Sequence, residues 1–330
     1  TLFHLPSDAK DPSEAIELFQ IKKKPINTLC GHGVNIKLSD AAIALSIEEQ
    51  SFIKECNFLK ATSQVMQNIK QGHPMNEPFP QSSVNISVVS SFTKAGHVFF
   101  ANVPHTYSQL QQAWLVSSSM GQDMSFEKAK GDERLRPAAG VAVRLVEDNY
   151  TSLVSHMNPA QVTGCVFCYL PLPINSRLSV HINGGFAVTS NRRYLKERSN
   201  DDKDESGGEW NEMLLKDAVC KAYLSAMQNL RRMMDLNSSV QSFYELWPLL
   251  NTAECLFDPL VRSFYAFLVQ NSLELFTDGK RWVDIEHALF LKPELRQIAG
   301  VGDVALDVLR QVSSSEKVVI DLPSSIAESL

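Results

Sequence analysis

The chain has 330 residues, of which 44% are hydrophobic, and a net charge of −6 from 31 basic and 37 acidic side chains. This length and composition are typical of a globular protein with two or three domains around buried cores. The negative balance excludes a nucleic-acid-binding protein that depends on a basic surface, and no apolar run of the sequence has the length of a membrane span.

The cysteine pattern and the first residues indicate where the chain works. The cysteines lack the spacing of a disulfide framework and no signal peptide precedes them, which predicts a reducing, cytoplasmic location. The six are Cys30, Cys56, Cys165, Cys168, Cys220 and Cys255. The sequence opens on TLFHLP, without a methionine and as though midway through a strand, which predicts a piece excised from a longer protein.

The first quarter of the chain is predicted to be mainly helical. Residues 1–5 indicate a short strand, and 13–24 indicate a capped helix that ends in a lysine run. Residues 26–72 are helix-prone, with apolar side chains at helical intervals from residue 47 on and a break near Asn57. Three prolines then predict a loop over 72–83.

The middle of the chain is rich in β-branched residues and alternates apolar with polar positions. This pattern predicts about five strands of one mixed sheet. The expected strands lie within 84–103, 113–117, 138–146, 162–172 and 182–188. With helices before and after them, they predict an α/β fold in which a mixed sheet is flanked by helices.

The last third becomes helical after a charged, glycine-containing stretch. Helices are expected at 210–234, 257–275 and 302–312, with a tight turn at 278–280 and strands at 281–284 and 318–322. The change in character predicts four parts. These are a connector (1–83), a sheet domain (84–195), a flexible loop (196–209) and a helix-rich C-terminal subdomain (210–330).

Cys165 and Cys168 have the spacing of half a zinc site, but no second pair follows to complete a tetrahedral set. On a strand these two residues also face opposite sides, so one metal ion does not reach both. We therefore expect structural cysteines and no metal site. A stand-alone hydrolase that pairs one of these thiols with His181 or His97 is the least favoured function.

Two adjacent arginines follow the last expected strand. Gly184 and Gly185 are expected to form the turn that directs Arg192 and Arg193, which come shortly after them. Two guanidinium groups at a strand exit suit a phosphate clamp that stabilises charge on a leaving γ-phosphoryl group. The alternative, which residue chemistry alone favours, is an exposed helix start capped by Ser190 or Asn191.

Several segments resemble the internal repeats of the sacsin family. The matching residues are 168–173 (CYLPLP), 180–184 (VHING), 186–188 (FAV) and 190–193 (SNRR), followed by Trp210 and Asn211 ahead of a long helix. Residues 1–6 resemble the strand that ends the ATP-binding domain of such a repeat, and 279–293 resemble its downstream segment.

The resemblance implies a fold and a site. Repeats of this family begin with an ATP-binding domain similar to that of the ninety-kilodalton heat-shock protein, whose nucleotide-binding elements are absent here. The chain would then be the following middle segment, similar to the middle domain of GHKL heat-shock chaperones. Arg192 or Arg193 would sense the γ-phosphate of ATP held by the neighbouring domain. Residues that position the loop would be Asn183, Gly184, Gly185, Ser190 and Asn191.

The resemblance also implies a function. The segment would be a co-chaperone module that couples the adjacent ATP-binding domain to client proteins and to the seventy-kilodalton heat-shock machinery, with a link to intermediate-filament organisation. It would bind no cofactor itself and would not be an enzyme on its own, although it would supply an arginine to the neighbouring ATPase. The alternative is a nucleotide-independent interaction scaffold, which an exposed apolar patch on Phe264, Phe267 or Trp282 would favour.

Overall fold

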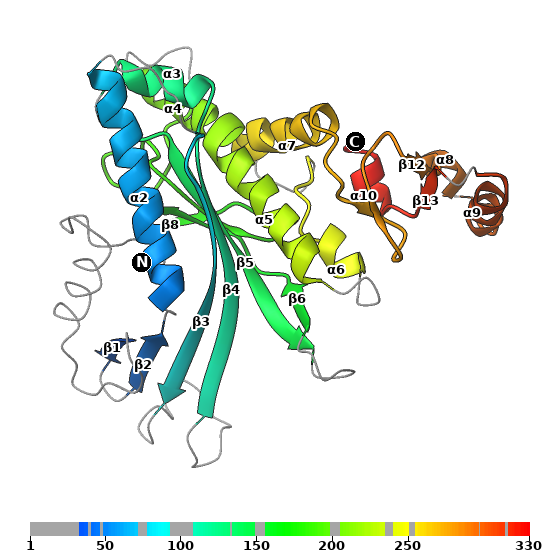
Figure 1. Ribbon diagram of the computed structural model, residues 1–330, viewed down its shortest axis with the longest axis horizontal. Helices are drawn as coiled ribbons and strands as arrows, with labels where there is room; N and C mark the ends of the chain where they lie inside the picture. The colour runs from blue at the N-terminus through cyan, green and yellow to red at the C-terminus, as the bar shows by residue number, and fades with distance from the viewer. Residues whose placement is uncertain are drawn as a thin grey trace.

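Figure 1 shows the computed structural model of the chain. The structure describes residues 33–38, 41–46, 49–71, 78–92, 108–132, 134–148, 156–198, 205–234, 240–250, 255–296, 298–313 and 316–330. The strand expected at 1–5 and the helix expected at 13–24 lie outside these residues. So does the whole stretch 93–103, which we expected to belong to the first long strand.

A mixed sheet of nine strands forms the centre of the molecule, in the order β1-β2-β3-β4-β5-β9-β7-β8, with β6 also paired to β5. Its strands are β1 (Gly33–Leu38), β2 (Ala41–Ser46), β3 (Gln81–Phe92), β4 (Ser108–Met120), β5 (Ala138–Asp148), β6 (His156–Ala160), β7 (Cys165–Cys168), β8 (Leu170–Asn175) and β9 (His181–Gly184). Neighbours are antiparallel except β7 and β9, which run parallel. The predicted fold class, a mixed sheet flanked by helices, is confirmed.

Helices cover both faces of this sheet (Figure 1). They are α2 (Glu49–Lys70), α3 (Met124–Lys130), α4 (Glu205–Leu214), α5 (Cys220–Met233), α6 (Val240–Tyr244) and α7 (Asp258–Gln270). Ser117 and Ser118 show which helix lies on which face, because consecutive strand side chains point to opposite sides. Ser118 donates to Glu55 of α2, whereas Ser117 pairs with Ser83, which accepts from Asn229 of α5.

The α5 face carries the main hydrophobic core. One cluster of buried residues joins β5 and β9 to α4, α5 and α7, and continues to the C-terminal strands. Val141, Ile182 and Leu214 are among its fully buried members. The sheet and the C-terminal helices therefore share one hydrophobic core, although we predicted that residues 196–209 separate two parts of the chain.

The C-terminal region adds two small sheets beyond α7. The strands β10 (Phe276–Thr277) and β11 (Trp282–Val283) form an antiparallel hairpin. The strands β12 (Ala288–Phe290) and β13 (Val318–Ile320) pair in parallel, and the chain between them forms α8 (Pro293–Arg296) and α9 (Val301–Val312). A last short helix, α10 (Ser324–Ala327), ends the chain. In Figure 1 this unit extends away from the large sheet.

Three local predictions were wrong. Residues 33–38 and 41–46 form β1 and β2 rather than helix-prone connector, because alternate apolar side chains suit a paired strand. Helix α2 runs through Asn57 without a break. Helix α4 begins at Glu205, inside the stretch predicted as a flexible loop. No described helix is both long and apolar enough to cross a membrane.

Candidate functional site: the arginine loop

The two arginines lie on a tight hairpin, residues 187–196, which we call the arginine loop. Its arms meet at an isolated bridge between Val188 and Leu195, and Lys196 N–H donates to Ala187 O at 2.9 Å. Nearer the tip, Thr189 N–H donates to Tyr194 O at 2.9 Å. The helix start considered for this stretch is therefore wrong, since the residues form a closed hairpin.

Ser190 and Asn191 make the turn at the tip. Asn191 Oδ1 accepts from the Thr189 hydroxyl at 2.8 Å and from Arg193 N–H at 3.0 Å, the arrangement of an Asx turn. Gly184 and Gly185 do not turn, contrary to our expectation, because Gly184 ends β9 and Gly185 continues from it. The space beside Gly184 is narrow, since a Cβ there would lie 3.0 Å from Phe186 Cε2 and 3.1 Å from Leu214 Cδ2.

A buried asparagine holds the base of the loop. Asn211 of α4 is 1% exposed, and its Nδ2 donates to Ala187 O at 2.7 Å and to Lys196 O at 2.9 Å. Its Oδ1 accepts from Ala187 N–H at 2.7 Å. The neighbouring Trp210 donates from Nε1 to Gly185 O at 2.8 Å. The start of α4 thus fixes both arms of the arginine loop, because the Asn211 side-chain amide bonds to Ala187 on one arm and to Lys196 on the other.

Two glycines in the first turn of α4 allow this contact. A Cβ on Gly208 would lie 2.3 Å from the carbonyl carbon of Glu197, and a Cβ on Gly207 would lie 2.5 Å from Lys196 Cδ. The chain at residues 196–197 therefore lies directly against α4, and a larger residue in place of either glycine would push the two apart. The same glycines gave the stretch its loop-like composition, which explains why the start of α4 was missed.

Arg192 is the anchored member of the pair. Its backbone is left-handed, with φ of 55°, and its Nη2 donates to Cys168 O at 3.0 Å at the end of β7. The Cys168 thiol in turn donates to Phe186 O at 3.3 Å. Because a left-handed conformation is unfavourable for arginine, the hydrogen bond to β7 and the hairpin closure must stabilise it.

Arg193 is the member of the pair whose guanidinium is available to a ligand. It is exposed, and within the described part of the chain its guanidinium makes no hydrogen bond or ion pair. Its backbone is nevertheless fixed by the bond from its N–H to Asn191. A cationic fork with five donors is thus presented to solvent from a rigid loop, which suits recognition of a phosphate or carboxylate.

Asn183 positions the strand beside the loop. Its Oδ1 accepts from Tyr169 N–H at 3.2 Å, at the left-handed residue (φ of 62°) that connects β7 to β8. Burial raises the pKa of the Tyr169 hydroxyl, although the nearby Arg136 guanidinium lowers it in part. Arg136, which our sequence reasoning did not single out, is therefore a third cation next to the base of the arginine loop.

A buried carboxylate fixes the connection that carries Arg136. Asp217 is 2% exposed and lies in a π-helical turn (Leu215–Val219) between α4 and α5. It accepts hydrogen bonds from the backbone of Gln122, Asp123 and Ser125, from the Ser125 hydroxyl at 2.7 Å and from Lys221 Nζ at 2.8 Å. Nothing in the helical spacing of the sequence distinguished this aspartate from a surface one.

The thiol and imidazole groups expected near β7 do not form a catalytic pair. His181 Nδ1 accepts from the backbone N–H of Cys165 at 3.0 Å, and its ring stacks on Trp114 with centroids 5.0 Å apart. Burial lowers the pKa of His181 and raises that of the Cys168 thiol, which is opposite to the activation of a nucleophile. His97 lies outside the described residues.

No cluster of three or more possible metal ligands occurs among the residues that the structure describes. The described cysteines are unpaired thiols, and the one at position 165 bonds to Thr163 O. The arrangement at the arginine loop thus offers guanidinium donors rather than a metal site.

Comparison with known proteins identifies the relationship of this chain. It is 30% identical over 231 residues to human sacsin. The chain is related to a region of sacsin. The match covers 64% of this chain but only 5% of sacsin, so it concerns a small part of that protein. No protein-family model and no solved structure matches the chain. The likeness to the middle domain of heat-shock chaperones therefore stays a prediction.

Proposed function

We propose that this chain is the middle segment of a sacsin-type repeat, a co-chaperone module that couples an adjacent ATP-binding domain to client or partner proteins. In this proposal the chain binds no cofactor itself and is not an enzyme on its own. It works in the cytoplasm together with the seventy-kilodalton heat-shock machinery. The relationship to sacsin supports the kind of module, and the arginine loop supports the coupling.

The observation that carries the proposal is the unequal pair of arginines. Arg192 bonds to β7, whereas the Arg193 guanidinium has no partner within the described residues. Arg193 is therefore the group that contacts the γ-phosphate, and Arg192 is a positioning residue. Charge-assisted bonds from a pre-positioned guanidinium stabilise a phosphoryl group strongly. The neighbouring Arg136 adds positive potential at the same end of the sheet.

The test is nucleotide binding by calorimetry on this chain and on a longer chain that includes the preceding ATP-binding domain. We expect binding only by the longer chain, and Arg193→Ala should weaken it by about tenfold, equal to about 1.4 kcal/mol. Arg134→Ala, which removes an exposed arginine paired to Asp132 on another connection, is the matched control. Unchanged affinity in Arg193→Ala would disprove the coupling.

Arg192→Ala separates the two roles. Loss of the bond to Cys168 O should weaken nucleotide binding and also speed amide exchange in the arginine loop. Arg193→Ala should weaken binding without changing amide exchange. If both variants leave binding intact, the arginine loop is not a nucleotide sensor.

A second candidate function is a nucleotide-independent scaffold, and exposed apolar side chains on α9 favour it. The patch predicted for it is absent, because Phe264 is fully buried and Phe267 and Trp282 pack against the core. Helix α9 instead exposes Val304, Val308 and Val312, whose exposed fractions are 62%, 50% and 73%. The scaffold function gains support if Arg193→Ala leaves nucleotide binding unchanged while Val304→Ser and Val308→Ser lower association with neighbouring repeats.

A further inference from the structure

Exposed apolar side chains lie next to the arginine loop. Tyr194 follows Arg193 on the loop and is 62% exposed, whereas Tyr169 and Leu170, where β7 turns into β8, are 43% and 54% exposed. We call Tyr169, Leu170 and Tyr194 the tyrosine rim. Single exposed apolar residues are ordinary on a protein surface, but a group of them beside charged residues marks an interaction site.

The two parts of the tyrosine rim lie close together. Arg192 Nη2 reaches from the arginine loop to Cys168 O at 3.0 Å, directly before the turn that carries Tyr169. The Tyr169 hydroxyl lies next to Gly185, because a Cβ placed on that glycine would be 3.7 Å from Tyr169 Oη. The same Cβ would be 3.7 Å from Arg136 Cβ. The turn, the arginine loop and Arg136 therefore lie side by side at this end of the sheet.

The backbone holds both parts of this surface in an unfavourable conformation. Tyr169 and Arg192 have φ of 62° and 55°, and they are two of the four left-handed non-glycine residues in the described part of the chain. Tyr169 N–H donates to Asn183 Oδ1 at 3.2 Å, and Arg192 N–H donates to Thr189 O at 2.8 Å. Residues in this conformation persist only where their surroundings enforce it, and they concentrate at functional sites. The tyrosine rim is therefore preorganised, which lowers the entropic cost of binding.

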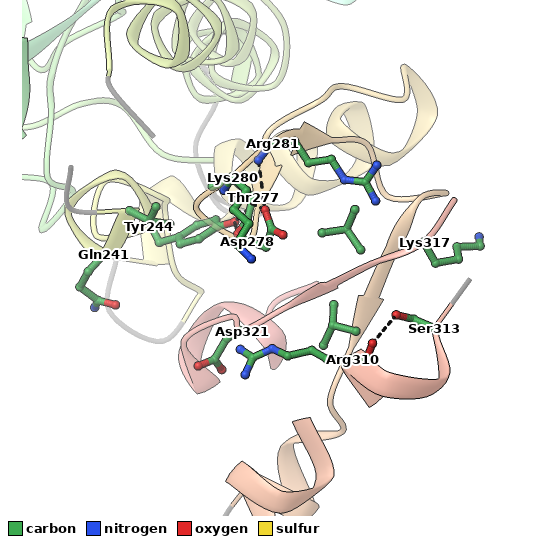
Figure 2. A pocket seen from close by; sticks show the side chains of 13 residues that line it. Gln241, Tyr244, Thr277, Asp278, Lys280, Arg281, Arg310, Ser313, Lys317 and Asp321 are labelled. Carbon is green, nitrogen blue, oxygen red and sulfur yellow. Dashed lines mark hydrogen bonds between the residues drawn. The ribbon is translucent and has the colours of Figure 1, made fainter. Parts of the chain in front are cut away.

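Positive charge alone does not distinguish this surface from others. A groove between the β10–β11 hairpin and β13 is also lined by cationic side chains (Figure 2). In that groove, however, Arg310 pairs with Asp307 at 3.1 Å and Lys317 donates to Glu286 O. These two cationic groups are therefore already engaged within the protein.

The arginines beside the tyrosine rim lack such partners. Arg136, Arg192 and Arg193 form no ion pair with any residue that the structure describes, although Arg192 donates to a backbone carbonyl. Three cations on one surface attract an anionic partner and repel a cationic one. The phosphate groups of a nucleotide held by a neighbouring domain supply such a charge.

We propose that the tyrosine rim is the surface on which the nucleotide-holding domain docks, and that in the docked state it excludes water from the contact between Arg193 and the γ-phosphate. This inference rests on the function proposed above. A guanidinium–phosphate contact is stronger where water is excluded, because the effective dielectric constant falls. Tyrosine is enriched among the anchor residues of interfaces, and the residues around a central contact serve to exclude water from it. Without the rim, salt would screen an arginine on an exposed loop.

The first test locates the docked domain in a longer chain that includes the preceding ATP-binding domain. The photoreactive residue p-benzoylphenylalanine takes the place of Tyr194, and crosslinks formed on irradiation are mapped by mass spectrometry with and without adenylyl imidodiphosphate. We expect crosslinks to the ATP-binding domain when the nucleotide is bound. The same group in place of Val146, which is 48% exposed near the far end of β5, is the matched control and should give none. No crosslink from position 194 to that domain, or crosslinks only between two copies of the chain, would overturn the proposal.

The second test measures the nucleotide affinity of the same longer chain by calorimetry at low and at high salt. Tyr194→Ser should weaken binding by about threefold at low salt and by about tenfold at high salt, because ions then reach the contact between Arg193 and the phosphate. Leu170→Ser should act in the same direction, whereas Val146→Ser should leave the affinity unchanged. Amide exchange at Arg193 checks that the arginine loop keeps its conformation in each variant.

Failure of the tyrosine rim is distinguishable from failure of the proposed function. If Arg193→Ala weakens binding but Tyr194→Ser changes neither the affinity nor its dependence on salt, the proposed function stands and the inference about the rim is wrong. If Arg193→Ala has no effect, the proposed function is wrong and the exclusion of water around Arg193 is overturned with it. Crosslinks from position 194 would in that case still identify the docking surface.

Discussion

Two buried carboxylates, one on each face of the large sheet, differ in how the protein treats their charge. Asp217 lies on the α5 side and accepts five hydrogen bonds, one of them from Lys221. Glu55 lies on the α2 side, 9% exposed, and accepts one bond from Ser118, while its Oε2 has no partner among the described residues.

The pKa values of the two acids move in opposite directions. Burial alone would raise the pKa of Asp217, but the bonds from Lys221, Ser125 and Gln122 outweigh it and hold the pKa below its usual range. Burial raises the pKa of Glu55, and the bond from Ser118 offsets only part of that effect. Burial alone therefore does not decide the charge of a carboxyl group, because the hydrogen bonds and charges that face it can outweigh the effect of burial.

The largest expected effect is that of removing Asp217. Asp217→Ala leaves three backbone N–H groups without their acceptor, and it leaves Lys221, which has 12% of its side chain exposed, with only its partner Asp123. We expect a loss of about 3–5 kcal/mol in the free energy of unfolding, measured by urea denaturation. A loss below about 1 kcal/mol would show that water replaces these bonds and that the comparison with Glu55 is wrong.

Lys221→Met should have a smaller effect, because Asp217 keeps four of its five donors. We expect a cost of about 2 kcal/mol. A lowered carboxyl pKa contributes stability above the unfolded value, and this stability is lost as pH falls through the folded value. Loss of the lysine raises the folded pKa of Asp217 and so moves acid unfolding to higher pH. Lys216→Met, beside it on the helix, is the control, since Lys216 pairs with Glu212 instead.

Glu55→Gln should have the smallest effect and the opposite sign. A raised carboxyl pKa contributes stability below the ordinary value of 4.5, and this stability is lost as pH rises through the folded value. Glutamine keeps the acceptor for Ser118 and carries no charge, so we expect a gain of about 1 kcal/mol at neutral pH. The gain should vanish in acid, and a gain that is independent of pH would show that the pKa of Glu55 is the same in the folded and the unfolded protein.

The sequence allowed prediction of the elements but not of the contacts between them. The strands β3, β4, β5 and β9 and the helices α2, α5, α7 and α9 follow their periodic patterns. Strand β6 was missed because the sequence HMNPA contains a proline and no alternation. Helix α3 was missed because seven residues are too few for a clear helical period.

The candidate site shows the same limit. The paired arginines and the glycines were visible in the sequence, yet the difference between Arg192 and Arg193 was not. It depends on Cys168 O, 24 residues away, and on Asn211, which bonds to both arms of the loop. Such partners are brought together only by the register of the sheet against α4. The sequence did not indicate the burial of Glu55 either, because a single acidic residue beside apolar positions of a helix is typical of the boundary between its buried and exposed faces.

The π-helical turn that contains Asp217 sets the phase of the whole 205–233 helix. A π turn holds one residue more than an α turn, so the residues before it are rotated by about 100° relative to those after it. Deleting one residue from 215–219 would restore a uniform helix and leave α5 seated on the sheet. Trp210 and Asn211 would then face away from Gly185 and Ala187. The extra residue thus rotates one end of this helix relative to the other, so that Trp210 and Asn211 face Gly185 and Ala187 while α5 faces the sheet.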